Sequence, residues 1–84
     1  MVIPKTPVTL SPSQIENLAK KLSTMRHDIN NHLSMVVFSV ELLRTKPELA
    51  ERMSSTLSEQ PAKISKDIAL FSAEFEKTFG IIRN

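Results

Sequence analysis

The chain has 84 residues, no cysteine, one glycine and a formal net charge of +2 at pH 7. This length allows one domain, and the lack of cysteine excludes disulfide bonds and thiolate metal sites, which favours a reducing compartment such as the cytoplasm. The 11 basic and 9 acidic residues are interspersed, and tyrosine and tryptophan are absent, so we expect no nucleic-acid partner. Apolar runs are shorter than the roughly 18 residues of a membrane span, and residues 1–14 do not resemble a signal peptide, so we expect no membrane contact.

A lead segment is expected over residues 1–10, and a first helix over about 12–44. Ser11 with Gln14 has the spacing of a capping box, and proline is favoured in the first turn of a helix. Apolar residues then recur three and four positions apart, the spacing of a helix that packs along one side. They are Ile15, Leu18, Leu22, Met25 and Ile29. The stripe then widens: Leu33, Val36, Val37, Val40 and Leu43 continue it with a phase shift, and Phe38 and Leu42 broaden it.

A hairpin turn is predicted near Pro47, because proline disfavours helix in the residue before it, and Thr45 with Glu48 suggests a second capping box. The second helix is expected over about 47–79, ending at Gly80, with a tail over residues 81–84. Pro61 predicts a kink or a local break around residues 57–61. The apolar stripe of this helix comprises Leu49, Met53, Leu57, Ile64, Ile68, Phe71, Phe75 and Phe79.

The predicted fold class is therefore all-α: an antiparallel helical hairpin over residues 11–80. Two rods of about 45–50 Å cannot cover each other's wide apolar stripes. A second copy of the chain would cover them, so we expect a homodimeric four-helix bundle.

The stretch RHDINNHL, residues 26–33, contains both histidines of the chain. In the heptad that starts at Ile15, His27 falls on the water-facing side of the helix and His32 on the core side or its margin. An exposed imidazole is largely neutral near pH 7 and offers a nucleophilic nitrogen, although a lone exposed histidine is most often only a solvated residue. Asp28 and His32, four residues apart, would ordinarily form a local hydrogen-bonded pair.

RHDINNHL resembles the H-box of two-component histidine kinases, in the form found in citrate and dicarboxylate sensor kinases and in the sporulation phosphotransferase family. The match rests on Arg26, His27, Asp28, Asn31 and Leu33, and on the placement of the box inside the first of two long helices. The resemblance implies the dimerisation and histidine-phosphotransfer domain, which is a homodimeric four-helix bundle.

The resemblance also implies roles for three residues. His27 would accept a phosphoryl group and exchange it with an aspartate of a response-regulator receiver domain. Asp28 would hold and deprotonate the imidazole, and Asn31 would position the attacking water or the phosphoryl group for dephosphorylation. Helix geometry by itself does not predict the role of Asp28, because adjacent helical residues do not share a face.

A histidine kinase also needs an ATP-binding domain with glycine-rich loops, whereas this chain has one glycine. We therefore expect no cofactor in this chain, with ATP and Mg²⁺ supplied by partner domains. The expected partners are a second copy, a receiver domain and an ATP-binding kinase domain in cis or in trans. The chain is then either a domain of a longer kinase or a free-standing phosphotransfer protein.

A second hypothesis is a catalytically inert dimeric hairpin that binds a kinase or a receiver, for example as an inhibitor. An enzyme active by itself is not supported, because we find no nucleophile, base and acid set and no metal-ligand cluster in the sequence.

Overall fold

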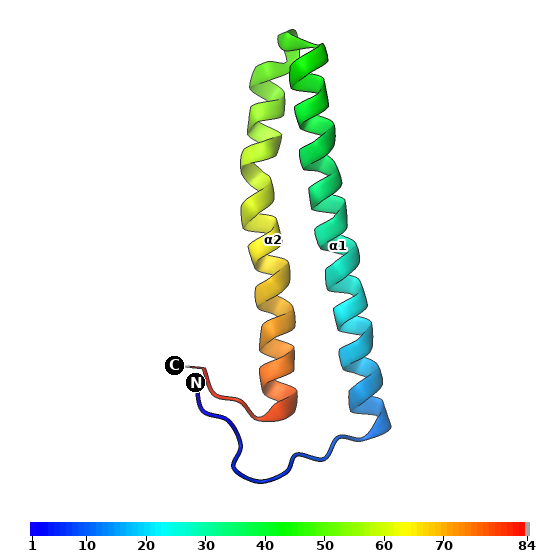
Figure 1. The fold of residues 1–84 in the computed structure, drawn as a ribbon, viewed down its shortest axis with the longest axis vertical. Coiled ribbons are helices and arrows are strands. Elements are labelled where there is room, and N and C mark those ends of the chain that lie inside the picture. Colours follow the sequence, from blue (N-terminus) through cyan, green and yellow to red (C-terminus); the bar gives the residue numbers. More distant parts are fainter. Residues whose placement is uncertain (84) are drawn as a thin grey trace.

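The computed structural model describes residues 1–83 as two long helices that lie side by side and run in opposite directions (Figure 1). Helix α1 spans Pro12–Thr45, a 3-10 turn (η1) spans Pro47–Leu49, and helix α2 spans Ala50–Phe79. The all-α antiparallel hairpin predicted from the sequence is confirmed. Residue 84, the last of the predicted tail, lies outside the described residues.

Helix α1 begins at the capping box that the sequence predicts. The Ser11 hydroxyl accepts a hydrogen bond from the backbone N–H of Gln14 over 3.1 Å, and the Gln14 side chain accepts one from the Ser11 backbone N–H over 2.8 Å. These two bonds satisfy backbone donors that the first turn leaves without helical partners. The helix start is therefore set locally by these two side chains.

The predicted second capping box is wrong. Lys46, not Thr45, is the residue that precedes η1, and it caps with no side-chain hydrogen bond. The Thr45 hydroxyl instead donates to the Glu41 carbonyl over 2.9 Å. Thr45 is the last residue of α1, and its hydroxyl bonds back into the preceding turn instead of capping η1.

Helix α2 is continuous through Pro61, so the predicted local break does not occur. Proline lacks the N–H that would bond to the Leu57 carbonyl, but the helical bonds on either side of it remain. The helix ends as predicted at Gly80, whose φ of 68° is the left-handed conformation that glycine adopts without strain. The N–H groups of Gly80 and Ile81 both donate to the Glu76 carbonyl.

The helices pack along one line of residues on each, which we call the seam. Seam residues are half-buried or buried and follow one another at alternating intervals of four and three residues, the spacing of paired helices. On α1 they are Leu18, Leu22, Met25, Ile29, His32, Val36, Ser39 and Leu43. On α2 they are Met53, Leu57, Gln60, Ile64, Asp67, Phe71, Glu74 and Thr78.

Polar side chains alternate with apolar ones in this seam. His32 Nε2 lies 3.0 Å from Asp67 Oδ2, so these two residues lie at the same level of the two helices and define their register. In that register Ser39 and Gln60, each one heptad further toward the turn, lie at the same level. They are the most buried residues of the described chain, at 0% and 3% exposed. The Ser39 hydroxyl and the Gln60 carbonyl oxygen have no hydrogen-bond partner.

Apolar side chains remain partly exposed throughout residues 1–83, and none is fully buried. The hairpin measures 59 × 28 × 12 Å, so it is only one helix thick. Its radius of gyration is 18.1 Å, against about 12 Å for a compact domain of this length. Two helices alone cannot enclose a core, since each can cover only one side of the other.

The chain termini meet at the end of the hairpin opposite the turn (Figure 1). Val2 and Ile82 form an antiparallel β-bridge with backbone hydrogen bonds of 2.6 and 2.9 Å. The Arg83 guanidinium donates two hydrogen bonds, of 2.8 and 2.9 Å, to the Glu76 carboxylate. This bidentate contact raises the pKa of Arg83, because the hydrogen bonds and the negative charge of the Glu76 carboxylate favour the charged guanidinium.

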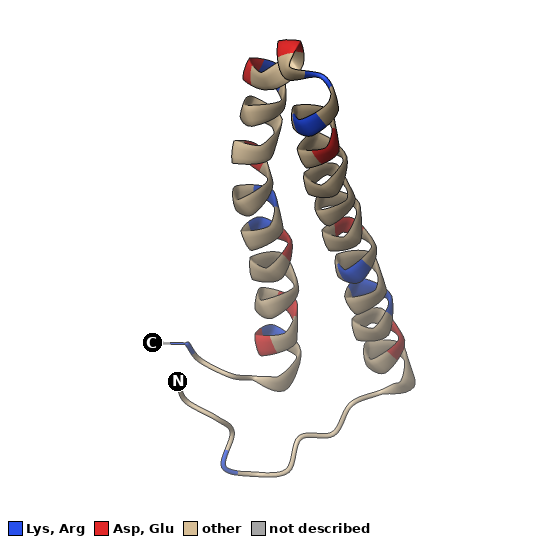
Figure 2. Ribbon diagram, turned by 45° about the horizontal axis from the view of Figure 1, so that its top comes forward, with Lys and Arg blue, Asp and Glu red and all other residues tan. Residues whose placement is uncertain are grey.

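Charged residues of both signs are distributed along both helices, without a stripe of one sign (Figure 2). Neither of the described helices has a stretch long and apolar enough to cross a lipid bilayer.

Candidate functional site

His27 lies on the outer edge of α1, directed away from α2. Two and a half turns of helix separate it from the seam residue Val36, so it points to the opposite side. Its side chain is 74% exposed. The sequence predicts this exposure, because heptad position alone sets which side of a regular helix a residue occupies.

Asp28 is adjacent to His27 in the chain, and the two side chains approach each other. His27 Nδ1 lies 3.4 Å from Asp28 Oδ1, which is longer than the usual 2.7–3.2 Å hydrogen bond. The Asp28 side chain is half-buried, at 44% exposed. Contact with Asp28 on the Nδ1 side leaves the Nε2 side of the imidazole directed to solvent.

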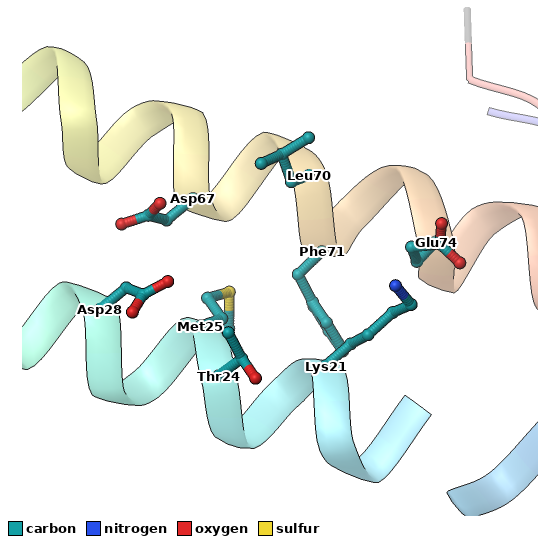
Figure 3. A pocket seen from close by; sticks show the side chains of 8 residues that line it. All are labelled: Lys21, Thr24, Met25, Asp28, Asp67, Leu70, Phe71 and Glu74. Carbon is teal, nitrogen blue, oxygen red and sulfur yellow. The ribbon is translucent and has the colours of Figure 1, made fainter. Parts of the chain in front are cut away.

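Asp28 also lines a groove of about 300 Å³ between α1 and α2 (Figure 3). In Figure 3 Asp28 on α1 and Asp67 on α2 lie on opposite sides of the groove. The lining carries three carboxylates and one ammonium group, so we call it the acidic groove. Its lining residues are Lys21, Thr24, Met25, Asp28, Asp67, Leu70, Phe71 and Glu74. Asp28 therefore connects the exposed edge at His27 with an acidic surface between the helices.

Asn31 lies one turn after His27 on the same side of α1 and is exposed. Ser23 and Thr24, which precede His27 by four and three residues, are also exposed and small. The surface around the imidazole is thus polar and uncrowded. A group as large as a phosphoryl donor can approach the Nε2 side without displacing a helix.

His32 occupies a different environment, five residues further along the same helix. Its side chain is 24% exposed and faces Asp67, which is 16% exposed. The buried Asp67 Oδ2 accepts no well-aligned hydrogen bond, so the two side chains lie close together without a directed hydrogen bond between them. The local pair expected between Asp28 and His32 does not form, because Asp67 from α2 occupies the position beside His32.

Asp67 and Glu74 are residues that the sequence analysis does not identify. Their signal is nevertheless present in the spacing: each follows an apolar seam residue, Ile64 or Phe71, by three positions, where the heptad requires a core residue. An acidic residue at such a position indicates a charge that faces the neighbouring helix.

Within residues 1–83, no three histidine or acidic side chains converge in a way that could hold a metal ion. No match to a protein family, to a curated protein or to a solved structure was found for this chain.

Proposed function

We propose that this hairpin is a phosphoacceptor and dimerisation module of bacterial two-component signalling, with His27 as the phosphoryl-accepting residue. The observation that carries the proposal is the position of His27: exposed on the outer edge of α1, with a carboxylate on its Nδ1 side and small polar neighbours. The resemblance of residues 26–33 to the H-box supplies the reaction class.

The chemistry needs little from this chain beyond a positioned nucleophile. The Nε2 lone pair attacks the phosphorus of an aspartyl phosphate or of ATP, a P–N bond forms, and the P–O bond to the leaving carboxylate or ADP breaks. Asp28 holds the Nδ1 proton, which keeps the Nε2 lone pair available and stabilises the positive charge that the ring acquires. The 3.4 Å contact shortens as that charge develops.

Asn31 acts in the reverse direction of the cycle. Its amide, one turn from His27, positions a water or the phosphoryl group when phosphate is removed. ATP and Mg²⁺ belong to partner domains, which are an ATP-binding kinase domain in cis or in trans and the receiver domain of a response regulator. The module acts in the cytoplasm, where these partners lie.

The second element of the proposal is homodimerisation into a four-helix bundle. Its support is the absence of any fully buried apolar side chain in residues 1–83. A second hairpin would double the number of helices around one axis and create the core that a single hairpin lacks.

Phosphotransfer to the purified chain tests the chemical part. The chain is mixed with phosphorylated receiver domains from the same organism, or with a matching ATP-binding domain and labelled ATP. We expect an acid-labile, base-stable label on the native chain and none on His27→Gln. Asp28→Asn should slow labelling about 10²-fold, in the range for loss of a group that holds a reacting proton. Asn31→Ala should be labelled but lose its label more slowly.

His32→Gln is the matched control, because it removes the other imidazole of the same octapeptide and should keep the label. If the native chain takes no label from any donor while it still binds a receiver or a kinase, the proposal fails. The alternative of an inert dimeric hairpin that acts by binding, for example as an inhibitor, then holds.

A further inference from the structure

The hairpin has two broad faces, and their residues differ in kind. Some residues outside the seam precede a seam residue by four positions. Lys21, Asp28 and Leu70 are of this kind, and they line the acidic groove together although they come from both helices. These positions therefore share one face of the hairpin. Residues outside the seam that follow a seam residue by four positions lie on the other face of the hairpin. This holds for both helices because both are right-handed and they run in opposite directions.

That second face is apolar in both helices. Leu33 and Val40 of α1 and Ile68 and Phe75 of α2 occupy its positions and are between 41% and 48% exposed. We call these four residues the apolar face. The positions of this face are 26, 33 and 40 on α1 and 61, 68 and 75 on α2, and of these only Arg26 is charged.

An aromatic row reinforces the apolar face near the chain termini. The Phe75 ring lies between Phe71 and Phe79, with ring centroids 6.2 and 4.6 Å apart. Aromatic side chains are enriched at the centre of protein interfaces, since each buries a large apolar area.

The exposed area indicates how much surface a partner would cover. The chain exposes 6444 Å², whereas a compact protein of 9.5 kDa exposes about 5,000 Å². The excess of about 1,400 Å² per chain would give a dimer interface of about 2,800 Å² in total, within the range of obligate homodimers.

We infer that a second copy of this chain covers the apolar face, and that the acidic groove and the His27 edge stay open to solvent in the dimer. This inference rests on the dimer of the proposed function and assigns its interface; it does not depend on the chemistry of His27. A second copy is the occupant of choice because a self-complementary apolar surface closes on itself by two-fold symmetry, and because the excess area matches one such interface.

Two matched pairs of substitutions test the assignment by sedimentation equilibrium. Ile68 and Leu70 are 48% and 59% exposed but lie about 200° apart on α2. Val40 and Met35, 43% and 42% exposed, lie about 140° apart on α1. Ile68→Glu and Val40→Glu should raise the dimer Kd about 100-fold or more, because each buries a charge. Leu70→Glu and Met35→Glu should leave the dimer Kd within about threefold of the native value, since their positions stay in solvent.

A second readout applies if the glutamate variants unfold when they dissociate. The chain has no cysteine, so Val40→Cys and Met35→Cys each introduce a single thiol. We expect a thiol-reactive label to modify the Val40→Cys dimer at least about tenfold more slowly than the Met35→Cys dimer, because only the first thiol is excluded from solvent.

A native chain that is helical and monomeric overturns both the inference and the dimer part of the proposed function. A native dimer that Leu70→Glu weakens as much as Ile68→Glu, or equal labelling of the two thiols, overturns the inference alone. Labelling of His27 in the phosphotransfer experiment is a separate measurement, so failure of the chemistry and failure of this interface are distinguishable.

Discussion

His27 and His32 lie five residues apart on one helix, yet they occupy opposite kinds of surface. His27 is 74% exposed on the outer edge of α1, whereas His32 is 24% exposed in the seam and faces Asp67 at 3.0 Å. An imidazole needs access to react, and it needs a fixed neighbour to stabilise a fold. Because the helical repeat places His27 on the outer edge and His32 in the seam, the first histidine has the access and the second has the neighbour.

The largest expected difference between the two regions is chemical. His27→Gln should abolish labelling in the phosphotransfer assay and change the free energy of unfolding by less than about 0.5 kcal/mol, because exposed side chains contribute little to stability. Labelling and chemical denaturation of the same preparation measure both quantities. Residual label above a tenth of the native level would place the phosphoacceptor elsewhere.

The seam pair should show the opposite behaviour. His32→Leu leaves the mostly buried Asp67 carboxylate without its partner and should lower the free energy of unfolding by about 1–3 kcal/mol. The double variant His32→Leu with Asp67→Leu should recover that loss, because an apolar pair needs no compensation for lost hydration. Urea denaturation of the four members of this cycle, at one protein concentration, measures the coupling. Additive losses in the double variant would show that the two side chains do not interact.

A third prediction compares a buried and an exposed serine of α1. Ser39→Ala removes a fully buried hydroxyl that has no hydrogen-bond partner and should raise the free energy of unfolding by about 1 kcal/mol. Ser34→Ala, at an exposed position of the same helix, should gain only the difference in helix propensity, about 0.5 kcal/mol. Equal gains from both substitutions would mean that the buried hydroxyl is solvated or paired.

The smallest effect is expected on the exposed edge. Lys20 and Glu16 form an ion pair of 3.1 Å, but their side chains are 75% and 68% exposed. Lys20→Ala should change the free energy of unfolding by no more than about 0.5 kcal/mol, and less at high salt, because water and ions screen such pairs. A loss above 1 kcal/mol would show that Lys20 contacts a partner chain.

Local signals in the sequence predict the start of α1 and the end of α2. Ser11 with Gln14 and Gly80 act through hydrogen bonds or backbone geometry within one turn, and each behaves as the sequence indicates. At Pro61 the helix does not break, because the surrounding helical hydrogen bonds maintain α2 across one missing donor, and the alternative of a kink stays a prediction. The exposure of His27 follows from heptad position, which needs no information about α2.

The partner of His32 could not be predicted in this way. A local rule favours Asp28, four residues earlier, but Asp67 from the other helix takes that place. Ile68 and Phe75 belong to the apolar stripe that the sequence shows on the second helix, but in the structure they are exposed beside the seam. The register of α1 against α2 decides both outcomes, and register depends on contacts between residues far apart in the chain.

The sequence by itself determined that this protein is helical, where the first helix begins and the second ends, and which histidine is exposed, since hydrogen bonds and periodicity within one helix control these features. Only the tertiary structure decided that Asp67 faces His32, that an acidic groove adjoins Asp28, and that the four residues of the apolar face come together from two helices. These features depend on how two antiparallel helices are rotated and aligned against each other, and no single helix contains that information.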